Sequence, residues 1–360
     1  MATVYRSTDA GAPSYPASST NGAAASAFMD ILKACLVDGY GSKPAAGWSV
    51  DYEDTTVQKR RIGLSNGNGV FEVVTWASVS VGLFIWDSIT TPGVGSIYDD
   101  SWPGVVSEGV NGWQHERIPA PGNSSDAVAC LYVNTFQSSQ ASNIAWTVVA
   151  DDKAFWFLSH YPEGHSSVDA SDSLNNAKGS YYPQLFVGAV KSPDLLRDDP
   201  GNFFLGFGGG SVPTAVNATG GSQQTLSNFW GLRTPMGTLP SAANNSDFEP
   251  YGLDFDRYKR NPLSSVRALL PALCSYKGSD VPKPSSLSSL YADYHFCSLP
   301  GICQLGESGS QGYFWINYNE WRGASWSLEP ATIGGYTWIP WSFSQNDLYE
   351  CGVTDHPDWW

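Results

Sequence analysis

The sequence predicts a mainly β protein with a few short helices, arranged as two β-rich, sandwich-like domains with an extended N-terminal arm. Composition is the first indication: 14% of the residues are aromatic, and the chain contains 37 glycines and 23 prolines. Glycine and proline interrupt helices, whereas bulky aromatic side chains fit the faces of a pleated sheet. Short apolar runs between turn-forming residues are the second indication.

Residues 1–20 are expected to form the arm, because TVYRS can pair as a strand and is followed by glycine, proline and serine. The next stretch predicts an amphipathic helix that Thr20 or Asn21 caps and that Gly39 ends in the left-handed conformation. Its apolar stripe recurs every three or four residues and consists of Phe28, Ile31, Leu32, Cys35 and Leu36. Trp48, Val50 and Tyr52 then alternate as in a half-buried strand.

Two hairpins are predicted in the first half of the chain. The stretches 57–64 and 70–86 flank SNGNG, in which asparagine and glycine supply the positive φ angles of a tight turn. AWTVVA and AFWFL are joined at Asp151, Asp152 and Lys153, with Trp146 and Val148 on one face and Phe155 and Phe157 on another. Between the hairpins, residues 88–125 are rich in turn formers and predict an exposed excursion. YYPQLFVGAV and NFFLGFG are expected to be further strands.

A domain boundary is expected at the glycine-rich segment 206–225, because glycine, serine and threonine bury little apolar surface. It would separate a β-rich N-terminal domain, residues 21–205, from an aromatic- and cysteine-containing C-terminal domain, residues 226–360. In the latter we expect one short helix at 264–273 that Pro271 ends or kinks. Closely spaced strands are expected at 312–330 and 334–343.

Charge and motif content exclude several function classes. The formal net charge of -15 argues against nucleic acid as a partner, since nucleic acid needs a positive surface. Membrane insertion is not expected, because no apolar run approaches the length of a span. The N-terminus lacks a secretory signal, so we expect assembly in a cytosol. Nucleophile-elbow, zincin, Walker and dinucleotide-binding motifs are absent from the sequence, so we expect neither an enzyme nor a cofactor.

The cysteines of the last third are a candidate metal site. His295 precedes Cys297 by two residues, Cys303 follows, and a fourth ligand could come from Cys274 or Cys351. The spacing lacks the paired C-x2-C of a strong zinc motif. Reduced core thiols are commoner in proteins assembled in a cytosol, and disulfides formed after release are a third reading.

The tryptophans are the candidate interface. The chain ends in two of them, Trp359 and Trp360, although free termini are normally polar. Trp338 and Trp341 lie close by in sequence. Interface hot spots favour tryptophan, so these four predict an assembly contact; a flat aromatic platform for a saccharide is the alternative, and core packing is the ordinary role of such rings.

Three stretches resemble virion structural proteins of tailed bacteriophages, an otherwise uncharacterised family: TVYRSTDAGAP, ILKACLVDGYGSKPAAGW and WTVVADDKAFWFL. They lie between residues 3 and 160. The resemblance carries no catalytic residue that could be transferred, and it does not extend to the tryptophan-rich last third. It implies a structural component of the virion.

These observations together lead to the expected function. We expect a part of the tail tip or baseplate that is assembled in the host cytoplasm and acts as a homo-oligomer bound to other tail proteins. The main alternative is a module that binds a host-surface receptor or saccharide. A capsid decoration protein is a lesser alternative.

Overall fold

The fold is given by a computed structural model. The residues that it describes are 1–16, 23–55, 60–77, 80–86, 88–91, 94–96, 113–114, 131–134, 143–160, 184–191, 197–198, 203–207, 214–215, 224–225, 229–234, 237–238, 269–276, 294–305, 330–341 and 351–360. Their regular structure is mostly strand in antiparallel sheets, with one short α-helix, which confirms the mainly β prediction.

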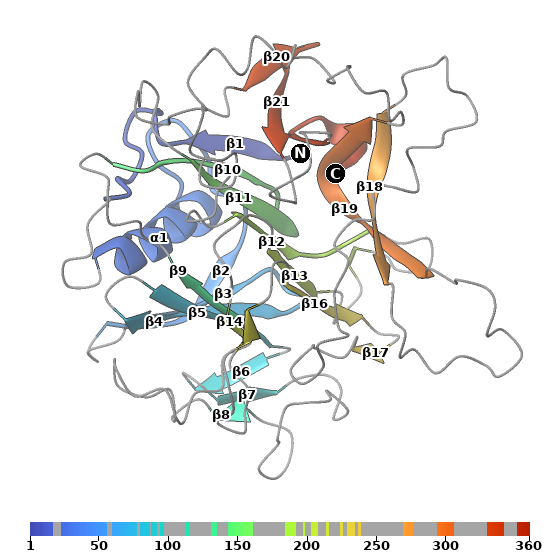
Figure 1. The fold of residues 1–360 in the computed structure, drawn as a ribbon. Helices are drawn as coiled ribbons and strands as arrows, with labels where there is room; N and C mark the ends of the chain where they lie inside the picture. Colours follow the sequence, from blue (N-terminus) through green and yellow to red (C-terminus); the bar gives the residue numbers. More distant parts are fainter. Residues whose placement is uncertain are drawn as a thin grey trace, which may run out of the picture.

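A seven-stranded antiparallel sheet forms the centre of the fold (Figure 1). Its strands, in spatial order, are β1 (Thr3–Arg6), β10 (Ala145–Ala150), β11 (Ala154–His160), β12 (Gln184–Gly188), β13 (Phe203–Phe207), β16 (Phe229–Thr234) and β17 (Gly237–Thr238). The strand expected in TVYRS is therefore confirmed as β1, at one edge of this sheet. β16 and β17 extend the sheet of β13, although the glycine-rich segment 206–225 separates them from it in sequence.

Two five-stranded sheets accompany the central one. The first contains β2 (Ser49–Asp54), β3 (Arg61–Ser65), β4 (Val70–Ala77), β5 (Ser80–Trp86) and β9 (Leu131–Asn134). The second contains β18 (Leu269–Tyr276), β19 (Tyr294–Leu305), β22 (Cys351–Thr354), β21 (Tyr336–Trp341) and β20 (Ala331–Ile333). Both predicted hairpins are confirmed, as β3–β4 and β10–β11, and so are the strands expected near residues 184, 203 and 336.

Small sheets complete the described strands. β6 (Ser88–Thr91), β7 (Val94–Ser96) and β8 (Trp113–Gln114) form one, and β14 (Thr214–Ala215) pairs with β15 (Gln224–Thr225). The first of these falls in the predicted excursion and the second in the predicted boundary segment. Residues 206 and 207 of the boundary segment end β13, and the remaining residues of the two segments lie outside the described residues. The strands expected at 312–330 also lie outside them, apart from Pro330.

Helix α1 (Ala23–Lys33) continues into a π-helical turn, η2 (Ala34–Asp38). All five residues of the predicted apolar stripe are buried, which confirms the helical period. The helix does not end as predicted: Gly39 has a positive φ of 73° but a ψ of 170°, so it is extended rather than left-handed helical. The chain leaves η2 because carbonyls of its last turn accept other donors; that of Leu36 receives the N–H groups of Gly47 and Trp48. Thr20 and Asn21, the predicted caps, lie outside the described residues.

The predicted helix at 264–273 is wrong from Leu269 onward, because residues 269–276 form strand β18. The helical period there covers few residues, and proline in a helix interior removes a hydrogen bond. In β18, Pro271 instead lies next to a register shift, where a sheet tolerates a residue without an N–H. Pairing with β19, a long-range contact, decides the structure of this stretch.

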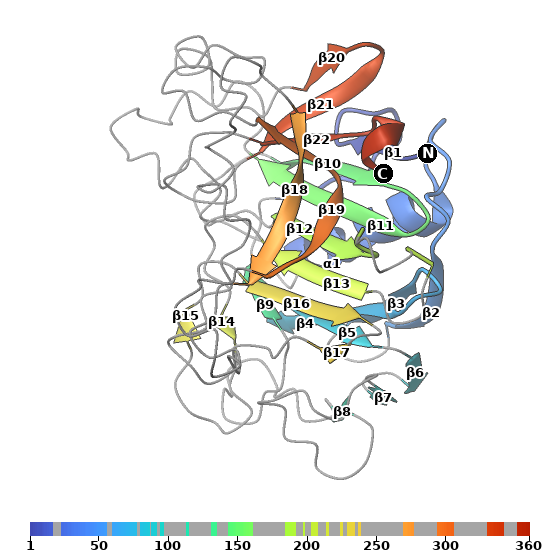
Figure 2. The same cartoon turned by 90° about the vertical axis from the view of Figure 1, so that its right-hand side faces the viewer.

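The central sheet is buried on both faces in its middle strands. One face carries Trp146, Val148, Phe155 and Phe157, which pack with α1 and with residues of β3 and β4 in one core. The prediction that the two hairpin strands use different faces is therefore wrong, since Val148 lies opposite Phe157 in the register. On the other face, Trp156 is fully buried and donates its indole N–H to the carbonyl of Pro300, 2.7 Å away. Figure 2 shows β18 and β19 crossing this side of the central sheet.

Helix α1 is held to the central sheet by apolar contact and to the first five-stranded sheet by charge. The Phe28 ring meets Phe157 edge to face, with 4.9 Å between ring centroids. Arg60, just before β3, forms ion pairs with Asp30 at 2.6 Å and with Glu53 at 2.7 Å. Lys33 bonds the same Glu53 at 2.6 Å. These charged groups are partly exposed, so the buried ring is the larger contributor to docking.

Replacing Phe28 with alanine is predicted to lower the free energy of unfolding by about 3–5 kcal/mol, because it leaves a cavity between α1 and the central sheet. Urea denaturation followed by circular dichroism measures this. The exposed Asp38 offers a control: Asp38→Ala should change stability by less than about 0.5 kcal/mol. Equal losses in the two variants would contradict this account of helix docking.

The ion pairs of Glu53 predict a dependence on pH. The hydrogen bond from Lys33, aided by Arg60, holds the pKa of Glu53 below its ordinary value of 4.5 against the opposing effect of burial. This carboxylate therefore contributes its full stabilisation above about pH 4.5, and the contribution is lost as pH falls through the lower pKa of the folded state. The free energy of unfolding of Glu53→Gln should fall less than that of the wild type between neutral and acid pH. Identical pH profiles in a urea series would refute the assignment.

Candidate functional site

The three stretches that carry the resemblance lie together in the structure. β1, from the first, pairs antiparallel with β10, from the third. The pairing continues beyond the strand, where the N–H of Ser7 donates to the carbonyl of Trp146 at 2.9 Å. The indole N–H of Trp146 in turn donates to the carbonyl of Pro13 at 3.1 Å. The first stretch is therefore bound along its length to the strand of the third.

The second stretch covers the open edge of β1. An edge strand presents N–H and C=O groups that have no strand partner. Here Lys43 donates through Nζ to the carbonyl of Val4 at 2.8 Å, and the Tyr40 hydroxyl bonds both the N–H of Arg6, at 3.1 Å, and its carbonyl, at 3.3 Å. The hydroxyl of Tyr5 donates to the carbonyl of Pro44 at 2.8 Å. Side chains thus bond backbone groups of β1 that would otherwise be open to pairing with a further strand.

Three titratable groups of this unit stay neutral near neutral pH. Burial raises the pKa of the Tyr5 and Tyr40 hydroxyls and raises that of the Cys35 thiol well above its ordinary value. A thiol with a raised pKa carries little thiolate, so Cys35 is a poor nucleophile and a poor metal ligand. These groups pack and donate hydrogen bonds; none of the three is poised for proton transfer near neutral pH.

Trp48 joins the second stretch to the third. Its indole N–H donates to the carbonyl of Asp151 at 3.0 Å, in a buried position. Its ring meets Phe155 edge to face at 5.4 Å and Phe203, on β13, at 6.2 Å. A buried indole needs such an acceptor, because an unmet N–H would cost free energy.

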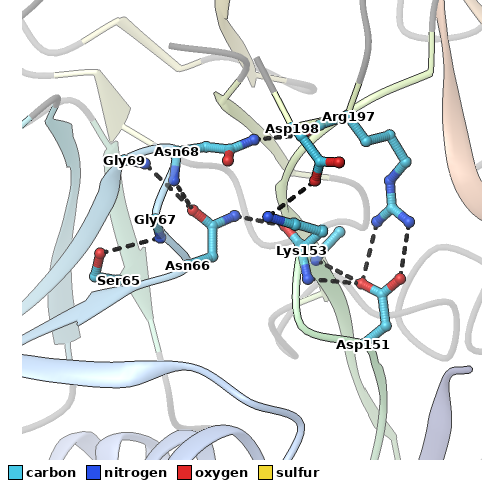
Figure 3. A network of polar contacts seen from close by, with 10 residues as sticks. Ser65, Asn66, Gly67, Asn68, Gly69, Asp151, Lys153, Arg197 and Asp198 are labelled. Carbon is cyan, nitrogen blue, oxygen red and sulfur yellow. Dashed lines mark hydrogen bonds and ion pairs between the residues drawn. The ribbon is translucent and has the colours of Figure 1, made fainter. Parts of the chain in front are cut away.

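The turn between β10 and β11 is the centre of a polar network (Figure 3). The carboxylate of Asp151 accepts the N–H groups of Lys153 and Ala154 at 2.9 and 2.8 Å, which fixes the tight turn. It also accepts both terminal nitrogens of Arg197, at 2.8 and 3.1 Å. This bidentate pair is geometrically specific, and the side chain of Asp151 is only 7% exposed.

The β3–β4 turn docks on the same place. Asn66 donates through Nδ2 to the carbonyl of Lys153 at 2.6 Å, and Asn68 donates through Nδ2 to the carbonyl of Arg197. As Figure 3 shows, side chains from one turn thus reach backbone oxygens of two other segments. The network joins elements from three regions of the sequence through hydrogen bonds and one bidentate ion pair. Its chemistry is that of a structural junction.

The four predicted interface tryptophans fall into different settings. Trp338, on β21, is buried at 5% exposure, and its ring is tilted against that of His356 with 6.1 Å between ring centroids. Trp360 docks on its own chain: its indole N–H donates to the carbonyl of Thr354 at 2.5 Å, and its ring covers Gly301, which has a φ of 73°. Trp359 is partly exposed in the 3-10 turn η3 (Pro357–Trp359). The side chain of Trp341 lies outside the described part of the structure.

A second aromatic pair borders this C-terminal segment. The rings of Tyr336 and His356 lie 4.2 Å apart, and both residues are partly exposed. His356 caps η3, because its Nδ1 accepts the N–H of Asp358 at 3.2 Å. We call Tyr336, His356 and Trp359 the C-terminal aromatic surface. It combines exposed ring area with nearby carboxylates, Asp355 and Asp358.

The predicted metal residues are described only through backbone register. Cys274 on β18 lies directly opposite Cys297 on β19, and His295 lies opposite Ser275 beyond a register shift. Cys303 is farther along β19, between Pro271 and Gly352, and Cys351 lies opposite Gln304. The pairing therefore brings Cys274 and Cys297 together, with Cys303 several positions away. Among the residues whose side chains the structure describes, no group of three or more candidate metal ligands occurs; the side chains of these cysteines and of His295 are not among them.

Several important residues could not be found from the sequence. Asp151 was visible as a turn residue, but nothing in sequence marks Arg197 as its partner. Gly301 follows Pro300 in a turn-forming Pro-Gly pair, but nothing in the sequence reveals that it lies under the Trp360 ring. The buried Trp156, which bonds Pro300, could be predicted as a core ring but not as a link to β19.

No protein-family model matches this chain, and no curated protein matches it. None of the described helices is both long and apolar enough to cross a membrane.

The bidentate pair at the β10–β11 turn predicts a matched comparison within one network. Arg197→Met leaves the buried Asp151 carboxylate without its cation and should lower the free energy of unfolding by about 2–4 kcal/mol. Lys153→Met breaks a pair with the 80% exposed Asp198 and should cost less than about 1 kcal/mol. Chemical denaturation measures both. If Lys153→Met costs as much as Arg197→Met, the network is not organised around Asp151.

Proposed function

We propose that this chain is a structural component of a tailed-bacteriophage virion, in the tail tip or baseplate, that acts through protein–protein contacts. One observation carries the proposal: the stretches that resemble virion proteins, distant in sequence, form a single packed unit. β1 pairs with β10, Lys43 bonds Val4, and Trp48 bonds Asp151. The residues that carry the resemblance therefore belong to one unit of the fold, whose parts pack against and constrain one another.

This packing supports the proposal because unrelated local matches have no reason to meet in space. Residues that share one core and one hydrogen-bond set constrain each other, so together they mark a fold. The neutral character of the buried Tyr5 and Cys35 and of the partly buried Tyr40 fits a structural role for the unit. In this account the unit is the scaffold, and the assembly contacts lie elsewhere on the chain.

The C-terminal aromatic surface is the proposed assembly contact. Trp359 offers a partly exposed ring, the residue type that most often anchors protein interfaces. Trp360 is bonded within the chain and holds the segment in place for it. The partner in this proposal is another tail protein, and the chain itself assembles as a homo-oligomer made in the host cytoplasm.

The finer organisation belongs to the same proposal. Two β-rich, sandwich-like domains would be centred on the seven-stranded sheet with its helix and on the sheet of β18–β22. Because β17 still belongs to the first sheet, the boundary between them would lie after Thr238 and before Leu269. Strand β1 of the predicted arm would then be an edge element of the first domain.

A second candidate function rests on the Tyr336–His356 pair. Closely packed, partly exposed rings beside carboxylates are a setting in which proteins bind saccharides, so this pair could contact a host-surface saccharide or receptor. Tyr336→Ala should then abolish binding of the purified protein to host cells. Binding that survives this substitution would remove the pair from consideration, and absence of binding by the wild type would remove the function.

Locating the protein in purified virions tests the proposal directly. A reconstruction of virions carrying an epitope-labelled copy should place the label at the tail tip or baseplate. A label on the head surface would favour the capsid decoration alternative instead. A particle that lacks the protein altogether would refute a virion role.

The two terminal tryptophans give a matched test of the assembly contact. Trp359→Ala should leave the free energy of unfolding within about 1 kcal/mol of wild type, yet abolish incorporation into particles, because it removes an exposed anchor. Trp360→Ala should lower stability by about 1–3 kcal/mol, because it removes a hydrogen bond and the cover of Gly301. Denaturation curves and quantitative mass spectrometry of purified virions give the two readouts. Normal incorporation of Trp359→Ala would refute the contact.

A further inference from the structure

The β3–β4 turn contains two consecutive Asn-Gly dipeptides, Asn66-Gly67 and Asn68-Gly69. Asparagine before glycine is chemically labile, because a glycine lacks the Cβ that would hinder attack of its backbone nitrogen on the asparagine side chain. At Gly67 the backbone has a φ of 85°, and an added Cβ would meet nothing within 4 Å. Sterically, therefore, nothing around Gly67 crowds this peptide bond.

The docked turn nevertheless restrains the amide of Asn66 at both ends. Its Oδ1 accepts the N–H groups of Asn68 and Gly69 at 2.9 and 3.2 Å, and its Nδ2 donates to the carbonyl of Lys153 at 2.6 Å. The attacking atom is engaged as well, since the N–H of Gly67 donates to the Ser65 hydroxyl at 3.3 Å. Asn66 as a whole is 8% exposed. The amide cannot turn toward the Gly67 nitrogen without giving up these bonds.

One of these bonds is different in kind. The contacts of Asn66 Oδ1 and of Gly67 are made inside the turn, whereas Nδ2 reaches another hairpin. The carbonyl of Lys153 can only accept, so it cannot supply the proton that a departing amide needs. Separating the two hairpins frees this amide and admits water. The lability of Asn66 is thus tied to one long-range contact.

We propose that Asn66 is a conditional deamidation site, whose amide is kept while the β3–β4 turn is docked on the β10–β11 turn and is lost once the turns separate. The Gly67 nitrogen forms a bond to Cγ of Asn66, its proton passes to the side-chain nitrogen, and ammonia leaves. The resulting succinimide is opened by one water molecule to aspartate or isoaspartate. Nothing is oxidised or reduced.

The reaction prevents the turns from docking again. In the product, a carboxylate oxygen replaces the Nδ2 donor that faced the carbonyl of Lys153. Both oxygens can only accept a hydrogen bond, so they repel each other. The position is nearly buried, so a new charge there is also poorly solvated. Isoaspartate further adds a carbon to the backbone of a tight turn. Opening of this junction therefore leads to an irreversible covalent change at Asn66.

The test is peptide mapping by mass spectrometry of the full chain during incubation at mildly alkaline pH. Each asparagine is compared with itself in the native protein and in urea, so intrinsic rates cancel. We expect Asn66 and Asn68 to deamidate about a hundredfold more slowly in the native protein, as opening from a stable core predicts. A slowing of more than about tenfold supports protection by docking, and a smaller one overturns it.

A variant tests the one-way step. Asn66→Asp imitates the product, so it should leave the turn undocked. An undocked turn also loses the bond from Asn68 to the carbonyl of Arg197, so the native deamidation rate of Asn68 should rise at least about tenfold. Asn66→Ser serves as the uncharged comparison and should raise that rate less. If Asn68 in Asn66→Asp stays as slow as in the wild type, redocking is possible and the one-way step is refuted. Should Asn66→Asp not fold, the native-against-urea comparison on the wild type still decides the first claim.

Discussion

The carboxylate of Asp151 holds the turn between β10 and β11, and three other parts of the chain are fastened to that turn. The carboxylate accepts two N–H groups of the turn and the guanidinium of Arg197. The carbonyl of the same residue receives Trp48, and that of Lys153 receives Asn66 and the N–H of Ala189. A turn usually lies at the solvent-exposed end of a hairpin. Here Asp151 and Ala154 are buried although Asp152 between them is exposed, because backbone acceptors of the turn are the anchors for the second stretch, for the β3–β4 hairpin and for the segment after β12.

This arrangement explains why the central sheet has to be apolar on both faces. Below the turn, Phe155 and Phe157 face α1 and the first five-stranded sheet; between them Trp156 faces the other way, toward Pro300 on β19. A strand buried on both faces does not alternate between polar and apolar residues, so it reads as a continuous apolar run. AFWFL is such a run, and its position between two layers is the reason. The high aromatic content first indicated a β fold. In this part of the chain the aromatic side chains are needed to fill the space between the central sheet and the layers on its two faces.

How much of this could be read from the sequence depended on the range of the interaction. The helix stripe from Phe28 to Leu36 and the two hairpins are local patterns, and the structure confirms them. The exit from the helix at Gly39 was predicted wrongly, because the bonds from Gly47 and Trp48 that set it arrive from beyond the helix. The stretch around Pro271 has a helical period but becomes a strand, since pairing with β19 outweighs local propensity. For the candidate site, the sequence singled out Trp360 as an interface residue but gave no sign that it bonds the carbonyl of Thr354, and it offered no means of pairing Arg197 with Asp151.

The claim on which the rest depends is that residues of the three resembling stretches fold and open as one unit. Native-state hydrogen exchange in a series of low urea concentrations measures it at the amides of Ser7, Trp48 and Ala154, which bond Trp146, Leu36 and Asp151 respectively. The account predicts one shared opening free energy for the three amides, with the same dependence on urea. The contrary result would be that Ser7 or Trp48 exchanges through a local opening independent of urea, while Ala154 exchanges only through a large, urea-dependent opening. The stretches would then be separate elements, and the unit that supports the proposed virion role would not exist.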